Sequence, residues 1–283
     1  MIVKYITKLK NNYSEFKVKF LGFLIDKKNQ NQLVHFYELL TEMTKRELVA
    51  RYKNTLFGLL WVIINPLMQM LVIGFVFRFF IKEPIPNYYL YLFTGLLVWN
   101  FFSLTLNKTT SSIFNERNLI KKTNFPREII PLSIILSNYV HFLISLLLLL
   151  LTSIMSNTFS FYNLSSLFFG SILLLLFTIG ISFLTSALNV KFRDVSFLIQ
   201  AITIIWFYAS PIVYSINVIP YKLIWIWRLN PMTSVIQLFQ NAFVSAPRPG
   251  IGMLGSNICV ILVIFMLGVK IFKNESKYFD DWL

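Results

Sequence analysis

The sequence predicts an all-α integral membrane protein with six transmembrane helices, an interfacial helix before the first of them and a re-entrant helical hairpin on the outer side. Its 283 residues are 56% hydrophobic and only 13% charged, whereas soluble domains are about 25% charged. Six apolar runs are long enough to cross a hydrocarbon core of about 30 Å. Lys and Arg gather at the ends of these runs, where anionic headgroups attract them. The net charge of +14 therefore indicates membrane lipids and no nucleic-acid partner.

The chain begins with a basic cytoplasmic extension, residues 1–32, which is rich in Lys and Asn. Two interpretations stay open for it: a basic amphipathic segment on the inner leaflet, or a partly disordered arm. Residues 33–54 are predicted as an interfacial amphipathic helix, because apolar residues recur there with spacings of three and four. That apolar face consists of Leu33, Phe36, Tyr37, Leu40 and Met43. Near the end of the helix, Glu47 and Arg51 are spaced for an i, i+4 ion pair.

Six spans are predicted within residues 55–272, and an even number places both termini on one side. The spans are Thr55–Ile81, Tyr88–Asn107, Pro131–Met155, Leu164–Val190, Val195–Ile216 and Ile251–Phe272. With the termini inside, 21 of the 26 Lys and Arg residues are cytoplasmic. The positive-inside rule therefore selects this orientation. Residues 273–283 form a cytoplasmic tail, in which Asp280-Asp281 is interpreted as a solvated pair.

Two prolines fall inside predicted spans. Pro66 leaves the carbonyl of Val62 without its helical donor, and Pro211 does the same for Phe207. Each proline marks either a simple kink or a break whose freed carbonyl is satisfied by protein or by a water-lined cavity. Pro211 is the stronger candidate for a break, because it leads into the most unusual segment of the chain.

That segment is residues 217–250, which are too few for two crossings and too hydrophobic for an outer loop. Two half-length helices separated at Asn230-Pro231 would fit it, because a residue before proline is pushed out of the helical region. The segment is therefore predicted as a re-entrant hairpin that dips into the outer leaflet. Tyr221, Trp225 and Trp227 suit either the membrane interface or a surface on which sugar rings stack.

The residues that the chain lacks limit its mechanism. None of the 12 acidic residues lies in the middle of a span, although ion-coupled carriers generally place an ionisable group there. His141 is a lone polar residue in the third span, Cys259 has no partner for a disulfide, and no residue pattern indicates a metal site. The P-loop motif GxxxxGK(S/T) is absent, so this chain does not bind ATP in that way. If it moves a large substrate, the energy comes from another subunit.

The first inner loop, residues 115–127, offers a docking surface for such a subunit. Glu116 opens a potential helical turn, and Phe125-Pro126 ends it. A plain connector would need none of the apolar residues of this loop, which are Leu119, Ile120 and Phe125. A segment that docks into a groove of a cytoplasmic motor is therefore favoured over a simple connection.

Six motifs follow one another in order over roughly residues 40–270. They are Arg46-Glu47-Leu48 with Arg51-Tyr52-Lys53 and Asn65-Pro66, Gly95 to Phe102, Leu119 to Lys122 with Asn124 to Arg127, Arg193-Asp194-Val195, Ser210 to Tyr214, and Leu229-Asn230-Pro231. Together they resemble the permeases of ABC-type polysaccharide exporters. The resemblance implies a homodimer in the bacterial plasma (inner) membrane, joined to two copies of a cytoplasmic ABC ATPase subunit. It implies ATP and Mg on that partner, no cofactor on this chain, and a polyprenyl-diphosphate-linked glycan such as O-antigen, capsule or teichoic acid as substrate.

The resemblance also implies roles for particular residues. The helix before the first span becomes a cytoplasmic gate, whose candidates for contact with the lipid diphosphate are Arg46, Glu47, Arg51, Tyr52 and Lys53. The first inner loop becomes the coupling segment, with the candidates Glu116, Leu119, Ile120, Lys121, Lys122, Phe125, Pro126 and Arg127. Arg193 and Asp194 of the second inner loop are further site candidates, to which no particular role is assigned. The hairpin becomes an outer gate, with the candidates Ser210, Pro211, Tyr214, Tyr221, Trp225, Trp227, Asn230 and Pro231. Guanidinium and ammonium groups at the inner boundary also suit a diphosphate on chemical grounds.

Two other functions stay open on the sequence alone. A permease for a drug or a small lipid would share the same architecture. A membrane enzyme acting on lipid-linked sugars would need grouped acids or histidines, and the inner-face candidates for that role are Glu47, Glu116 and Asp194.

Overall fold

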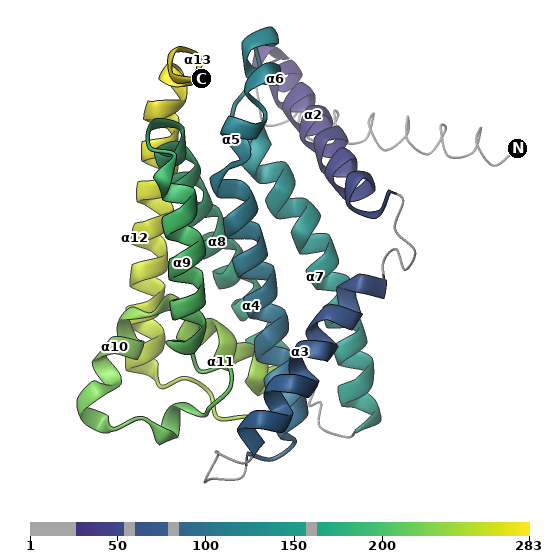
Figure 1. Cartoon of the computed structure of the whole chain (residues 1–283), viewed down its shortest axis with the longest axis vertical. Helices are drawn as coiled ribbons and strands as arrows, with labels where there is room; N and C mark the ends of the chain where they lie inside the picture. Colours follow the sequence, from purple (N-terminus) through teal and green to yellow (C-terminus); the bar gives the residue numbers. More distant parts are fainter. Residues whose placement is uncertain (1–26, 54–59, 79–84, 157–162) are drawn as a thin grey trace, which may run out of the picture.

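The computed structural model describes residues 27–53, 60–78, 85–156 and 163–283, so most of the predicted extension 1–32 lies outside the described residues. The described residues form helices and no strand, which confirms the all-α class. The helices make an elongated bundle (Figure 1). Its principal members are α2 (Lys27–Tyr52), α3 (Trp61–Arg78), α4 (Tyr88–Thr110), α7 (Ile129–Met155), α8 (Leu164–Lys191), α9 (Asp194–Tyr208), α11 (Pro231–Val244) and α12 (Ile251–Glu275).

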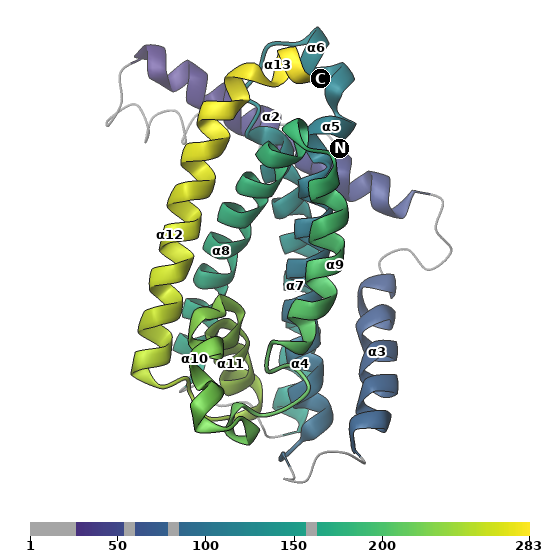
Figure 2. The ribbon, with the colours of Figure 1, turned by 60° about the vertical axis from the view of Figure 1, so that its left-hand side comes forward.

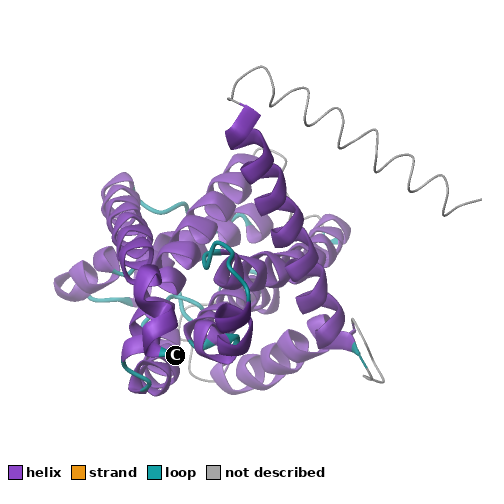
Figure 3. Cartoon of the chain, turned by 90° about the horizontal axis from the view of Figure 1, so that it is seen from above, coloured by secondary structure: helices purple, strands orange, loops and turns teal. Residues whose placement is uncertain are grey.

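The two ends of the bundle carry different elements (Figures 1 and 2). One end, named here the tail end, carries α5 (Ser112–Asn115), α6 (Arg117–Lys122), η5 (Ser276–Tyr278) and α13 (Phe279–Trp282). The opposite end, named the hairpin end, carries η3 (Ile216–Val218), η4 (Tyr221–Leu223) and α10 (Ile224–Leu229). Helix α2 lies across the bundle at the tail end (Figures 2 and 3). It starts earlier than predicted, at Lys27, and packs along α7.

Four of the predicted spans are confirmed as long apolar helices. Helices α4, α7, α8 and the helix that starts at Ile251 are long and apolar enough to cross a membrane. The first predicted span contains α3, with Pro66 inside the helix as expected. The rest of that span, at residues 54–59 and 79–81, lies outside the described residues.

The fifth predicted span, Val195–Ile216, is wrong at its outer end. Helix α9 has 15 residues and ends at Tyr208, so its length of about 22 Å falls short of a hydrocarbon core of about 30 Å. Pro211 lies beyond the helix and is not a kink within it. The Phe207 carbonyl that was expected to lose its donor instead accepts from the backbone N–H of Ser210 at 3.2 Å.

The hairpin is split at Asn230-Pro231 as predicted, but its two arms are unequal. Helix α11 is the second arm, and its first 13 residues, 231–243, are buried against α8 and α4. The first arm is not a half-length helix, because it consists of the turns η3 and η4 and the six-residue helix α10. Pro220 lies between η3 and η4, where a proline donates no backbone hydrogen bond. The chain therefore re-enters the bundle as one helix after an irregular approach.

Two apolar cores hold the bundle together. The larger one packs α4, α8, α9 and α11 around Phe102, Phe177 and Phe239. The smaller one lies at the tail end and joins Leu40 and Met43 of α2 to Ile120, Phe272 and Phe279. Asp280 and Asp281 are exposed, as predicted for a solvated pair, but Phe279 beside them is fully buried. Asp280 accepts a hydrogen bond from Arg127 at 2.7 Å, which ties α13 to the first inner loop.

Helices α8 and α12 cross in backbone contact at two glycines. A Cβ added at Gly268 would overlap the carbonyl oxygen of Gly180, and a Cβ at Gly180 would lie 2.5 Å from the Cα of Phe265. Small residues at such crossings let membrane helices approach closely and gain dispersion energy.

We predict that Gly268→Ala destabilises the folded protein by about 1–3 kcal/mol through overpacking. Gly255→Ala on the same helix is the matched control, because a Cβ there meets nothing within 4 Å. Its higher helix propensity would be neutral or stabilising by up to about 1 kcal/mol. Thermal unfolding of the two variants in one detergent makes the comparison, and equal unfolding temperatures would contradict the prediction.

Candidate substrate pathway and coupling surface

A cavity of about 710 Å³, named here the main cavity, lies between α3, α4, α7 and the end of α2. Side-chain amides form much of its polar lining, and three aromatic rings form part of its apolar lining. The amides are those of Asn65, Gln69, Asn100, Asn107 and Asn138, and the rings are those of Trp61, Phe101 and Phe142. This lining offers many paired donors and acceptors beside flat apolar faces.

The charge of this main cavity is positive. Arg51 and Lys108 line it together with His141, and no described lining residue is a carboxylate. Arg51 does not form a simple surface ion pair with Glu47. Its guanidinium donates to Oδ1 of Asn138, and the Asn138 amide in turn donates to Oγ1 of Thr105 at 3.0 Å. The gate residue Arg51 is thus fixed by α7 and α4 from inside the bundle.

Helices α3 and α4 are joined across the main cavity by a pair of amides. Nδ2 of Asn100 donates to Oε1 of Gln69 at 2.9 Å. Pro66 is buried and lines the same cavity, one turn before Gln69 on α3. Pro66 therefore lies beside the polar cavity, inside a helix that continues through it.

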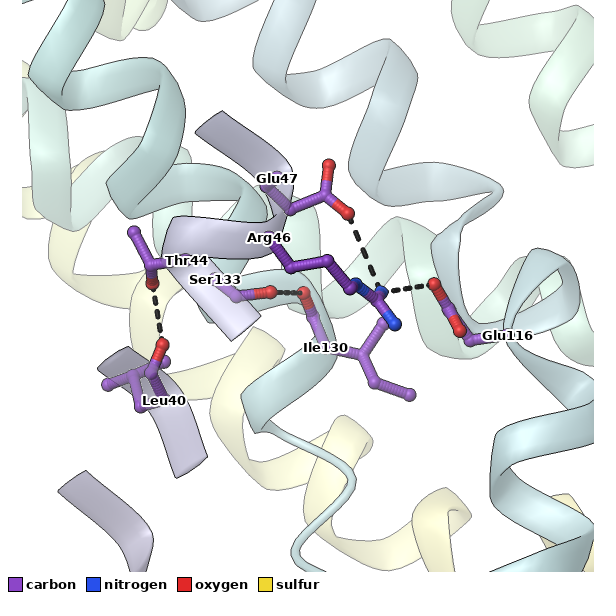
Figure 4. A network of polar contacts seen from close by, with 7 residues as sticks. All are labelled: Leu40, Thr44, Arg46, Glu47, Glu116, Ile130 and Ser133. Atoms are coloured by element: carbon purple, nitrogen blue, oxygen red, sulfur yellow. Dashed lines mark hydrogen bonds and ion pairs between the residues drawn. The ribbon is translucent and has the colours of Figure 1, made fainter. Parts of the chain in front are cut away.

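A smaller cavity of about 190 Å³ lies closer to the tail end. Its lining includes Arg46 and Glu47 of α2, Glu116 between α5 and α6, and Lys108, which also lines the main cavity. The Arg46 guanidinium lies between the two acids (Figure 4): it forms an ion pair with Glu116 and lies 3.6 Å from the Glu47 carboxylate. The gate helix and the coupling segment are thus connected by one arginine.

The remaining gate candidates are Tyr52 and Lys53. The Lys53 side chain is exposed at the end of α2. The Tyr52 side chain lies outside what the structure describes. The structure therefore brings together three of the five gate candidates, with Arg51 facing the main cavity and Arg46 and Glu47 facing the smaller one.

The coupling segment forms a helix that packs inward on its apolar side. Helix α6 follows Glu116 as predicted, but it ends at Lys122, ahead of the predicted stop at Phe125-Pro126, because Thr123 is extended. Ile120 is buried in the smaller core, and Leu119 and Phe125 pack against it. The apolar residues thus pack the segment against its own chain. Its exposed side is polar and basic, and includes Arg117, Asn118, Lys121 and Lys122.

The second inner loop contacts the first one through a shared aromatic ring. The Arg193 guanidinium lies 4.6 Å from the centre of the Phe114 ring, and the Arg117 guanidinium lies 5.0 Å from it. Asp194 is the first residue of α9, where a negative charge is favourable at a helix N-terminus. The contacts of Arg193 therefore place the second inner loop beside the coupling segment.

The outer-gate candidates gather around Asn230, which is buried between α9 and α11. Oδ1 of Asn230 accepts from Nε1 of Trp206 at 2.8 Å and from the N–H of Met232 at 3.1 Å, which caps α11. Nδ2 of Asn230 donates to the Ala209 carbonyl and to Oγ of Ser210, each at 3.1 Å. The four bonds tie the end of α9 to the start of α11.

Tyrosines extend this network across the hairpin end. The Trp227 indole donates to the hydroxyl of Tyr214 at 3.2 Å, and that hydroxyl donates to the Tyr208 carbonyl at 3.0 Å. The Tyr91 hydroxyl of α4 donates to the Tyr214 carbonyl at 3.1 Å. Trp225 is exposed, and the Tyr221 side chain lies outside what the structure describes.

The sequence analysis did not identify Lys108 and Asn138 as residues that line the main cavity, and it treated His141 as a packed residue. A signal for them was present. Asn100 and Asn107 are seven residues apart on α4, and Asn138 and His141 are three apart on α7, so each pair lies on one helix face. Polar residues that share a face inside an apolar span indicate a lined cavity.

A bundle of apolar helices around a polar cavity is the architecture of a multi-pass membrane transport protein. The chain belongs to the ABC-2 type transporter family, whose model matches residues 38–244. It is 32% identical to the O-antigen export system permease protein RfbA of Klebsiella pneumoniae, over 89% of this chain and 96% of the relative. It is 29% identical to the protein of the same name from Myxococcus xanthus, over 88% and 97%. It is 21% identical to the polysialic acid transport protein KpsM of Escherichia coli, over 82% and 91%.

These matches confirm the resemblance on which the residue roles were based. They identify a transporter and set aside the alternative of a membrane enzyme.

We predict that Asn230→Ala lowers the free energy of unfolding by roughly 2 kcal/mol, because it removes an N-cap and three further hydrogen bonds of roughly 0.6 kcal/mol each within the membrane. Asn217→Ala is the control, since Asn217 is an exposed asparagine in the same segment. Thermal unfolding in detergent measures both. Equal unfolding temperatures for the two variants would refute the structural role of Asn230.

Proposed function

We propose that this chain is the transmembrane subunit of an ATP-driven exporter. The exporter moves a polyprenyl-diphosphate-linked polysaccharide of the O-antigen, capsule or teichoic acid type from the cytoplasm to the outer face of the bacterial inner membrane. The observation that carries the proposal is the main cavity, with five amides, three aromatic rings and a positive charge among its lining residues. Amides exchange hydrogen bonds with sugar hydroxyls, and cations pair with a diphosphate.

We favour a glycan over a drug or a small lipid because the lining carries five side-chain amides that can exchange hydrogen bonds with sugar hydroxyls. Here Asn65, Gln69 and Asn100 belong to facing helices, α3 and α4, so polar groups approach a ligand from two sides. The names of the relatives, which are polysaccharide export and transport proteins, support this choice.

The proposed assembly contains two copies of this chain and two copies of a cytoplasmic ABC ATPase, which supplies ATP and Mg. The tail end then faces the cytoplasm, in agreement with the excess of Lys and Arg in the inner segments. The ATPase contacts the exposed basic side of α6, which carries Arg117, Lys121 and Lys122. Because the opposite side of α6 is fixed to the smaller core, a push on α6 moves the tail end as a unit.

Arg46 carries this motion to the gate. Its ion pair with Glu116 connects α6 to α2, and five residues further along α2 the Arg51 side chain enters the main cavity. Movement of the coupling segment therefore shifts the residue that faces the substrate. The gate helix and the coupling segment move together in this proposal.

The first test of the function is co-expression with an ABC ATPase subunit from the same genome. We expect a complex of two permeases and two ATPases by native mass measurement. We also expect a hydrolysis rate that changes when polyprenyl-diphosphate glycan is added to the reconstituted complex. A drug or a small lipid that changes hydrolysis while the glycan leaves it unchanged would overturn the proposed substrate.

Charge reversal tests the connection between Arg46 and Glu116. Arg46→Glu and Glu116→Arg should each reduce the glycan exported per ATP by roughly two- to thirtyfold, the range of mutations that alter coupling between sites. The double reversal should recover most of it. All three variants should fold normally, because a half-exposed ion pair contributes at most about 1 kcal/mol.

Lys45→Glu is the matched control for the Arg46 and Glu116 variants. Lys45 lies 2.6 Å from Glu42 in an exposed pair on the same helix, and neither of these residues lines a described cavity. Its export should match that of the wild type. Failure of the double reversal to restore export would contradict a direct Arg46–Glu116 connection.

A further inference from the structure

Lys108 occupies the wall that separates the two cavities. It lies in the last turn of α4 and lines both the main cavity and the smaller one. A cation in the last turn of a helix is favoured by the helix dipole, which explains why a lysine is tolerated at this position. The dipole does not explain why its side chain lies between two cavities among polar residues.

The charges around Lys108 are unevenly distributed. The acids of the smaller cavity are Glu47 and Glu116, and both of them are close to Arg46. Within the described ranges, the Lys108 ammonium itself forms no ion pair. On its other side the main cavity adds Arg51 and no carboxylate among the described lining residues. Positive charge in a cavity between membrane helices is costly unless an anion neutralises it.

Arg51 and Lys108 reach the same space from two different helices. Arg51 is held by Asn138, and Asn138 is held by Thr105 at 3.0 Å. Thr105 and Lys108 are three residues apart and therefore lie on one face of α4. This chain of contacts brings the guanidinium and the ammonium to the same end of the main cavity. Two cations from two helices suit a ligand with two adjacent anionic groups better than a single phosphate.

We propose that Arg51 and Lys108 together form a diphosphate site at the tail end of the main cavity, with Lys108 as the residue that receives the anion from the smaller cavity. The proposal rests on the proposed function, since the diphosphate is that of the lipid-linked substrate. The amides of Asn100 and Gln69 then lie further along the same cavity, where the first sugars follow the diphosphate. The shared chemistry is a lipid phosphate, which anionic phospholipids also carry.

The test measures binding to the reconstituted permease–ATPase complex in nanodiscs of zwitterionic lipid. The probe is a fluorescent polyprenyl diphosphate without sugars, and the comparison is the corresponding monophosphate. Lys108→Gln should raise the Kd for the diphosphate about tenfold or more, as expected for the loss of a charge-assisted contact. Its effect on the monophosphate should be smaller, and Lys108→Arg should restore most of the affinity.

Lys273→Gln is the matched control, because Lys273 is an exposed lysine in the last turn of another long apolar helix and lines neither described cavity. An unchanged Kd in a folded Lys108→Gln variant would overturn the site. Displacement of the probe by anionic phospholipid at bilayer concentrations would assign it to membrane lipid and overturn its assignment to the substrate. A wild-type complex that binds the diphosphate and exports no glycan would count against the proposed function and leave the diphosphate site standing.

Discussion

The structure depends on the requirement that every backbone polar group at membrane depth has a partner. Residues 209–214 leave the helical path after α9, and side chains supply donors for the carbonyls at this end of the helix. The carbonyls of Tyr208 and Ala209 accept from Tyr214 and Asn230. Those of Pro211, Val213 and Tyr214 accept from Gln240, Tyr88 and Tyr91, in that order. The donors come from α4, α11 and the hairpin itself, so the irregular segment holds three parts of the bundle together.

Hydrogen bonds support the irregular segment at the hairpin end, whereas apolar packing holds the polar coupling segment in place at the tail end. Ile120 fastens α6 to a core that also contains residues of α2, α8, α12 and α13. The Arg127–Asp280 pair adds a second attachment between the loop and the C-terminal helix. A helix of six residues would not be stable alone. Because it is fixed on one side and basic on the other, α6 suits the transmission of force from a partner.

Between these two ends, the positions of the charged side chains outline the proposed substrate pathway. Arg46 forms ion pairs with the two acids at the boundary, Glu47 and Glu116. Arg51 and Lys108 then face a cavity in which amides are the main polar groups. A neutral, hydrogen-bonding path behind a positive entrance suits a substrate whose only fixed charge is at its lipid end. The same arrangement disfavours a cationic drug through repulsion.

The family was recognised from the resemblance of six motifs in order. The sequence by itself also determined the class, four long spans, the helix before the first span and the break at Asn230-Pro231. These follow from local rules: apolar length, charge at span ends, helical periodicity and the effect of proline on its neighbour. The tertiary structure decided which polar residues meet. Asn138 and Arg51 are 87 residues apart, and Arg127 and Asp280 are 153 apart, and no local pattern encodes such distances. It also decided that α9 stops at Tyr208, because the carbonyls of Ala209, Pro211, Val213 and Tyr214 accept from side chains of other elements. It decided that Lys108 faces two cavities, because cavities exist only once helices have packed.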